Sequence, residues 1–161
     1  LVLMLSATIT GTILTHYENA FQAIPLLVSF IPMLMDTGGN CGSQSATLII
    51  RGIALDEIHF SDILRVMFKE FRISLIVGCA LAAANGLRIL IMYQSLEMAF
   101  VIAMSLIATI VISKMIGCIL PLCAKKIHLD PAIMAAPLIT TLVDTCSVMV
   151  YFAIATQVFR L

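Results

Sequence analysis

Two aspartates stand out because each lies in a strongly apolar stretch and is followed by threonine. Asp36 opens the tripeptide Asp36-Thr37-Gly38, and Asp144 precedes Thr145. A pair of carboxylates can divide the general acid and base roles in catalysis, or it can bind a cation. Which chemistry applies depends on the elements that carry the two acids.

The composition indicates an integral membrane protein. Of the 161 residues, 61% are hydrophobic and 11% are charged, and the mean hydropathy is +1.12. A soluble domain is about 45–50% apolar and about 25% charged, so a water-soluble chain of this composition would lack a polar surface. The formal net charge is zero, which gives no indication of a nucleic-acid partner.

Other side chains that could bind a metal are scattered along the chain. The five cysteines form no CxxC pair and mostly lie in apolar runs, which favours buried core positions. His16, His59 and His128 fall in separate polar breaks. We therefore expect no metal cluster built from histidine or cysteine.

The chain begins with Leu1, inside an apolar run. This run lacks the basic flank and the small-residue cleavage site of a signal peptide. We expect the chain to begin within or beside a membrane helix, as a fragment of a longer protein or as a sequence trimmed at its start.

Hydropathy and turn signals predict an all-α membrane protein with five transmembrane helices, because a span needs about 20 mostly apolar residues. The expected helices cover residues 1–15, 23–54, 63–93, 98–124 and 131–159. The polar breaks between them are HYENAFQ, LDEIHFSD, QSLE and KKIHLD. In the last break, Asp130 is expected to cap the final helix and Pro131 to occupy its first position.

Basic residues predict the orientation, since Lys and Arg are concentrated in cytoplasmic loops. Arg65, Lys69 and Arg72 follow the second expected helix, and Lys125 and Lys126 follow the fourth, whereas the other two breaks contain neither Lys nor Arg. The N-terminus is therefore expected inside and the C-terminus outside. The stretch ILRVMFKEFR is amphipathic and suits an interfacial start of the third helix.

Asp144 lies near the middle of the fifth expected helix, where a charge costs about 2.5–3.5 kcal/mol. It belongs to one helical stripe, in which Thr140, Asp144, Ser147 and Tyr151 follow Pro137 at helical spacing. Hydroxyl groups alone commonly form interhelical hydrogen bonds. A central aspartate on the same face instead favours a hydrophilic path.

The cassette MLMDTGGNCGSQS places a second polar stripe in the second expected helix. Asp36, Asn40 and Gln44 lie at i, i+4 and i+8, and Thr47 and Arg51 continue near that side. Six polar residues occur within ten positions of this cassette. Such a density favours a cavity over a simple helix contact.

The glycines of the cassette allow two interpretations. Gly38 and Gly42 have the GxxxG spacing that lets two helices approach closely. The run Gly38-Gly39-Asn40 at membrane depth also predicts local unwinding, which would turn free carbonyl groups toward a cavity.

Two cations also lie at membrane depth. Lys114 is in the middle of the fourth expected helix, and Arg88 is toward the outer end of the third. Each can pair with an acid or extend to the interface, and we assign neither to a site.

An aspartyl protease is the catalytic alternative. Pepsin-like enzymes are soluble all-β proteins, and intramembrane aspartyl proteases carry Tyr-Asp on one helix and Gly-x-Gly-Asp on another. Here the contexts are Met35-Asp36 and Val143-Asp144. Neither context matches, so we do not expect an enzyme.

The stretch PLLVSFIPMLMDTGGNCGSQSATLIIRGIALDEI resembles the second membrane helix of the MgtE family of magnesium channels and transporters. The matching core is GGNxGxQS at residues 38–45, followed by Arg51-Gly52. The stretch DPAIMAAPLITTLVDTCSVMVYF resembles the family's fifth helix, with Asp144 at the position of its central aspartate. The resemblance covers almost the whole chain, and the expected helix count and orientation agree with it.

The resemblance implies a homodimer in which the second and fifth helices line a pore on the two-fold axis. It implies that Asp144 of both subunits, with Thr140, holds a hydrated Mg²⁺, which is both the transported ion and the pore ligand. The pore-lining candidates are Asn40, Gln44, Gly38, Gly39, Ser147 and Pro137. We expect a multi-pass protein of the bacterial inner membrane. Family members usually carry a cytoplasmic magnesium-sensing domain before this part, and we expect none within these residues.

Asp36 lies outside the matched core. It is one turn before Asn40, toward the expected outer end of its helix, so we expect it at the external mouth, where an acid raises the local cation concentration. Pairing with Lys114 or Arg88 is the alternative. At the level of function, the alternatives are a Na⁺- or H⁺-coupled exchanger of divalent cations and a non-transporting membrane subunit that uses the polar stripe for assembly.

Overall fold

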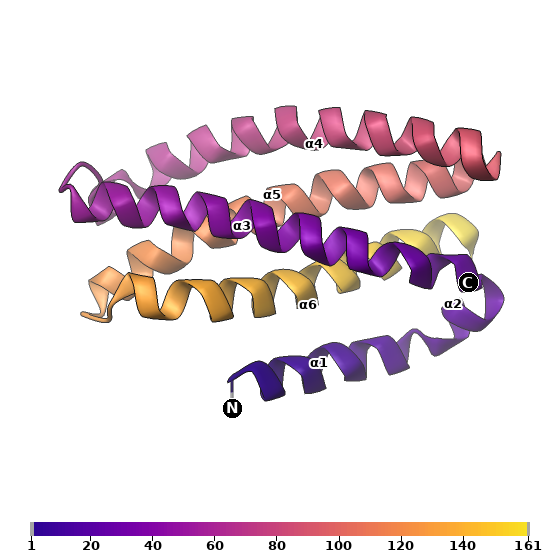
Figure 1. Cartoon of the computed structure of the whole chain (residues 1–161), viewed down its shortest axis with the longest axis horizontal. Coiled ribbons are helices and arrows are strands. Elements are labelled where there is room, and N and C mark those ends of the chain that lie inside the picture. Colours follow the sequence, from indigo (N-terminus) through magenta and orange to yellow (C-terminus); the bar gives the residue numbers. More distant parts are fainter. Residues whose placement is uncertain (1, 161) are drawn as a thin grey trace.

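The computed structural model is a bundle of long helices (Figure 1). It describes the backbone of residues 2–160 and the side chains of residues 4, 8–18, 22–131 and 138–160. The α-helices are α1 (Val2–His16), α2 (Glu18–Ala23), α3 (Ile31–Ala54), α4 (Ile63–Tyr93), α5 (Leu96–Lys126) and α6 (Pro131–Phe159). The 3₁₀ turns η1 (Pro25–Phe30) and η2 (Phe60–Asp62) precede α3 and α4. Residues 2–160 contain no strand, which confirms the all-α class.

The helices lie close to their expected ranges. α4 and α6 run over residues 63–93 and 131–159, and α5 is longer than expected by two residues at each end. Two segments differ from expectation. The first polar break contains the short helix α2, and the expected second helix begins with the turn η1 rather than with α-helix. Pro25 starts that turn, because proline needs no hydrogen-bond acceptor at a first helical position.

The glycine cassette does not unwind. α3 is continuous from Ile31 to Ala54, so the predicted release of carbonyl groups at its glycines is wrong. The reason is packing, because Gly38 and Gly42 are buried and the neighbouring helices hold their backbone in place. Ser113 Oγ donates a hydrogen bond to the Gly38 carbonyl from α5 without interrupting the helix.

The central helix is α5, which packs against α3, α4 and α6. Small residues recur every four positions along one side of it and are buried: Ser105, Thr109, Ser113 and Gly117. A Cβ on Gly117 would meet the Gly42 carbonyl of α3, and a Cβ on Gly42 would lie 2.9 Å from Ser113 Oγ. The GxxxG spacing therefore marks a close helix crossing, which brings the cassette directly onto α5.

An apolar cluster closes the end of the bundle where η1 meets α6. Tyr151 and Phe152 of α6 and Leu27 of η1 have no exposed surface. The Tyr151 hydroxyl donates a hydrogen bond of 2.9 Å to the Leu27 carbonyl, which satisfies two polar groups inside the cluster. Tyr17 stacks on Phe152 with ring centroids 5.0 Å apart, so the end of α1 joins the same cluster.

Three segments of the described chain are long and apolar enough to cross a membrane: Phe60–Tyr93, Leu96–Lys126 and Leu138–Phe159. α3 is not among them because its polar cassette lowers its hydropathy, although its 24 residues extend about 36 Å. α1 has 15 residues, fewer than the roughly 20 that a span needs. The chain is therefore a multi-helix membrane protein, and five spans with an inside N-terminus stay a prediction.

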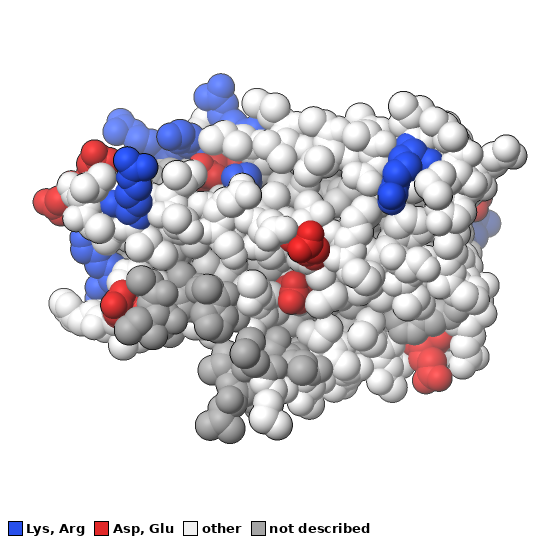
Figure 2. Space-filling model, viewed as in Figure 1, with Lys and Arg blue, Asp and Glu red and all other residues white. Residues whose placement is uncertain are grey.

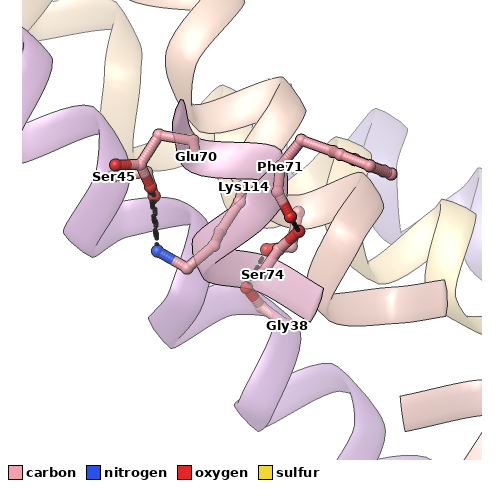
Figure 3. A network of polar contacts seen from close by, with 7 residues as sticks. Gly38, Ser45, Glu70, Phe71, Ser74 and Lys114 are labelled. Atoms are coloured by element: carbon pink, nitrogen blue, oxygen red, sulfur yellow. Dashed lines mark hydrogen bonds and ion pairs between the residues drawn. The ribbon is translucent and has the colours of Figure 1, made fainter. Parts of the chain in front are cut away.

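A buried ion pair joins α3, α4 and α5 (Figure 3). Lys114 Nζ lies 3.0 Å from Glu70 Oε2 and 3.1 Å from Ser45 Oγ. Ser45 Oγ donates a hydrogen bond of 2.9 Å to the same carboxylate oxygen. All three residues are buried, with Lys114 the most exposed at 7%. Lys114 therefore pairs with Glu70, not with Asp36.

Ser45, Glu70 and Lys114 come from α3, α4 and α5. Their contacts therefore connect three helices at one height in the bundle. The effective cost of removing one charge from water is several kcal/mol, and mutual hydrogen bonds offset that cost. Rotation or sliding of α3 would separate Ser45 from the pair. We infer that the pair holds α3 in register with α4 and α5.

We expect Lys114→Met to lower the free energy of unfolding by about 3–5 kcal/mol, because it leaves the Glu70 carboxylate buried without its cation. The double variant Lys114→Met/Glu70→Met removes both charges and should recover most of that loss. The measurement is thermal unfolding in detergent followed by circular dichroism, with Lys125→Met, at an exposed position in the last turn of α5, as the control. A single variant as stable as the parent would contradict a structural role for the pair.

Candidate functional site

α3 and α6 form a cavity of about 230 Å³ at the surface of the helix bundle. Its lining residues are Met35, Asp36, Gly39, Asn40 and Ser43 from α3, and Thr140 and Asp144 from α6. The helical repeat explains this set, because residues spaced by three or four positions lie on one side of a helix. Asp36 and Asp144 thus face the same cavity, although they are far apart in the sequence.

The electrostatic character of the cavity is acidic. Asp36 is exposed, Asp144 is half-buried, and no basic residue is among those that line the cavity. Figure 2 shows acidic side chains in the middle of this face, over α3 and α6, with uncharged residues around them. Two carboxylates that share a space repel each other and both attract a cation. The cavity is therefore suited to a cation.

The ligand atoms around the cavity are oxygens from carboxylate, amide and hydroxyl groups. Among the residues that the structure describes, no three His, Cys, Asp or Glu side chains come together to hold a metal ion directly. A hard cation such as Mg²⁺ accepts oxygen ligands and keeps several waters where protein ligands are few. The cavity is open at the surface of the helix bundle, so a divalent cation bound there can keep several of its waters.

The two adjacent glycines of the cassette have different surroundings. A Cβ on Gly38 would lie 2.8 Å from Thr109 Cγ2 and 2.8 Å from Val143 Cγ1, so packing requires glycine there. A Cβ on Gly39 would lie 3.8 Å from Thr140 Cγ2, which is an ordinary contact. Gly39 therefore contributes free volume to the cavity, whereas Gly38 allows the close helix contact.

The other candidate residues lie outside the cavity lining. Gly38 and Ser147 are buried at the contact of α3 with α6, where Ser147 Oγ would lie 3.1 Å from a Cβ on Gly38. Gln44 is exposed on α3. Pro137 belongs to α6, but its side chain is outside the described residues.

The polar stripe of α6 is divided between two environments. Thr140 and Asp144 face the cavity, whereas Ser147 and Tyr151 are buried. The second pair is covered by η1 and by the first half of α3. The Tyr151 hydroxyl donates its hydrogen bond to Leu27, and Ser147 Oγ would lie 3.1 Å from a Cβ on Gly38. The described part of α6 therefore presents its polar surface to the cavity along only part of its length.

The polar stripe of α3 lies at the surface of the helix bundle. Its five members are all exposed: Asp36, Asn40, Gln44, Thr47 and Arg51. In a membrane-spanning chain, a row of such groups cannot contact hydrocarbon without a large cost in free energy. The stripe must therefore face water or another protein surface.

Several residues of the site were not recognised from the sequence. Ser43 and Met35 line the cavity, and Ser43 is seven positions after Asp36, a spacing that places both on one side of a helix. Ser105 and Thr109 of α5 have buried hydroxyl groups without a hydrogen-bond partner among the described residues. Nothing in the sequence singled out Glu70, although a lysine in the middle of a membrane helix implies a buried acid as its partner.

The chain is similar to known proteins of one family. The model of the MgtE family, described as a divalent cation transporter, matches residues 31–154. The magnesium transporter MgtE of Bacillus subtilis (strain 168) is 36% identical over 156 residues, which are 97% of this chain and 35% of that protein. The magnesium transporters MgtE of Thermus thermophilus and Enterococcus faecalis are each 32% identical, over 96% and 94% of this chain and 34% and 33% of their own lengths.

The chain spans about a third of the length of the curated relatives it matches. The family match covers α3, α4 and α5 and most of α6, and so includes both helices that form the acidic cavity. The chain therefore belongs to the MgtE family of divalent cation transporters.

Proposed function

We propose that this chain forms the ion-conducting membrane part of a magnesium transporter. The observation that carries the proposal is the cavity that joins Asp36 and Asp144 beside an exposed polar stripe on α3. Membership of a family of cation transporters supports transport over the protease alternative. Relatives named as magnesium transporters support Mg²⁺ as the ion.

In this proposal, Asp144 and Thr140 hold a hydrated Mg²⁺ within the pore. The Asp144 carboxylate accepts hydrogen bonds from the water shell of the ion. The hydroxyl oxygen of Thr140 on α6 and the amide oxygen of Asn40 on α3 accept further hydrogen bonds from these waters. Mg²⁺ loses its waters reluctantly, so a wide ring of acceptors binds it at a lower cost than a tight cage would. Gly39 keeps the space that the water shell needs.

We further propose a homodimer in which α3 and α6 of both subunits line a pore on the two-fold axis. The exposed stripe of α3 needs water or protein against it, and a second copy would supply both by enclosing an aqueous path. Paired Asp144 carboxylates would then match the two positive charges of the ion. The protein would be a multi-pass protein of the bacterial inner membrane.

We expect Asp144→Asn to reduce Mg²⁺ flux by about tenfold or more, because it keeps the shape of the side chain and removes its charge. At 4 Å, two unit charges attract each other by about 1–4 kcal/mol at effective dielectric constants of 80 to 20, and a factor of ten corresponds to about 1.4 kcal/mol. The measurement is Mg²⁺ entry into proteoliposomes that contain a magnesium-sensitive dye. Glu97→Gln, which removes an exposed acid from the first turn of α5, is the control.

Three results of this assay would change the proposal. Parent-like flux in Asp144→Asn would move the ion site elsewhere. No flux in the parent would favour an assembly subunit. Flux that requires a Na⁺ or H⁺ gradient would favour a coupled exchanger over a channel.

We expect Gln44→Cys, in a background without the native cysteines, to form a disulfide-linked dimer under mild oxidation in lipid vesicles. Gln44 is exposed on the α3 stripe, which the proposal places near the two-fold axis. Ile76→Cys is the control, because Ile76 is 72% exposed on α4 and should face lipid. The readout is the mass of the product on a denaturing gel. The dimeric pore would be excluded if Gln44→Cys forms no crosslink and the protein is a monomer in lipid that retains full flux.

We expect Asp36→Asn to lower Mg²⁺ flux at low ionic strength, with a loss that shrinks as salt is added. Asp36 is exposed, and salt screens exposed charges because the Debye length is only about 8 Å at physiological ionic strength. Flux should be measured over a series of salt concentrations beside the melting temperature, which should change little. A large fall in melting temperature, with a flux defect indifferent to salt, would instead assign Asp36 a structural role.

A further inference from the structure

The first four turns of α4 form a basic groove that is separate from the acidic cavity. The groove has a volume of about 430 Å³ and is lined by Arg65, Phe68, Lys69, Arg72, Ile73 and Ile76. Its polar lining consists of three cations, with no acidic residue among them. Figure 2 shows that Lys and Arg gather at the end of the molecule where α4 begins. The groove is therefore suited to an anion.

Apolar surface adjoins the three cations. Phe68 is 64% exposed and Ile76 is 72% exposed. The Arg72 guanidinium lies 6.0 Å from the centre of the Phe68 ring, so the charged and apolar parts of the groove are in contact. The helix α4 lies within a segment that is able to cross a membrane. Its exposed apolar side chains would therefore contact lipid tails.

The length of α4 places the cations near the lipid headgroups. Its 31 residues extend about 46 Å, whereas the hydrocarbon layer is about 30 Å thick. A centred helix therefore extends about 8 Å beyond the hydrocarbon at each end. Arg65 lies in that extension and Lys69 at its boundary. Side chains on a helix point toward its N-terminus, which carries the charged ends of Lys69 and Arg72 outward.

We propose that this groove binds an anionic phospholipid. The three cations would hold the phosphate and the negative headgroup, and Phe68 and Ile76 would lie against an acyl chain. Arginine suits this role because its planar guanidinium donates paired hydrogen bonds to phosphate oxygens. A zwitterionic lipid has the same phosphate, but its headgroup ammonium would be repelled by the three cations. The proposal concerns a different surface from the pore and does not depend on it.

The test uses the absence of tryptophan from the sequence. Phe68→Trp places the only tryptophan of the chain in the groove, at a largely exposed position. The variant is reconstituted into vesicles that contain brominated phosphatidylglycerol or brominated phosphatidylcholine, both of which quench tryptophan on contact. We expect phosphatidylglycerol to bind at this position about tenfold more tightly or better, because each basic residue near an anionic surface contributes roughly a factor of five.

The cations are then removed in matched pairs. Adding Arg65→Gln and Arg72→Gln should lower the preference by about tenfold or more, because two of the three cations are removed. Lys69 stays in place because it also lines a cavity beside Glu70. Adding Lys125→Gln and Lys126→Gln removes the same charge from the same end, where Lys126 Nζ lies 4.2 Å from the Phe60 ring, and should leave the preference unchanged. Arg65→Lys with Arg72→Lys keeps the charge and should retain most of the preference.

Four outcomes would overturn the proposal. Equal quenching by the two lipids in Phe68→Trp alone would exclude an anionic lipid site, whatever the other variants do. A preference that survives Arg65→Gln/Arg72→Gln, or that is lost equally in Lys125→Gln/Lys126→Gln, would assign it to overall charge. Displacement of the lipid by millimolar inorganic phosphate would show that the groove binds free phosphate. Circular dichroism of each variant confirms that the helices are intact.

Discussion

A polar group at membrane depth costs free energy unless it is paired, hydrogen-bonded or in contact with water. Several contacts between the described helices meet this requirement, whereas the buried hydroxyl groups of Ser105 and Thr109 have no partner among the described residues. Lys114, Glu70 and Ser45 satisfy one another between three helices. Tyr151 satisfies the Leu27 carbonyl. Asp36 and Asp144 are neither buried in this way nor placed near a cation, and they face an open cavity instead.

The two polar sides of α3 have different surroundings. Ser45 points into the bundle and meets the Lys114–Glu70 pair, whereas Asp36 and Asn40 face the cavity. The separation matters for the charge of the cavity. A lysine beside Asp36 or Asp144 would neutralise one of the carboxylates that attract a cation, but Lys114 is buried and pairs with Glu70. No basic residue is among those that line the cavity, so the cavity is acidic.

Close packing of small residues makes this arrangement possible. Gly42 of α3 and Gly117 of α5 approach so closely that a Cβ on Gly117 would meet the Gly42 carbonyl. Because α3 lies against α5 on its glycine side, its polar stripe is turned outward, where a second copy or water can meet it. Gly39 lies on the cavity side and leaves volume there. Helix packing and the shape of the cavity therefore follow from neighbouring residues of the same cassette.

The amino-acid sequence was enough to predict the membrane class, the helical fold, the approximate helix limits and the polar positions that can attract a cation. These features depend on hydropathy, helical period and capping, which are local properties of the chain. The sequence also singled out Asp36, Asn40, Thr140 and Asp144, and the folded chain brings all four to one cavity. The structure was needed to show that Glu70 is the partner of Lys114, that the cassette stays helical, and that the polar stripe of α6 is half covered. These outcomes depend on which helices pack together and on how far each is shifted along its neighbours. Contacts between residues far apart in the sequence leave no local pattern from which to predict them.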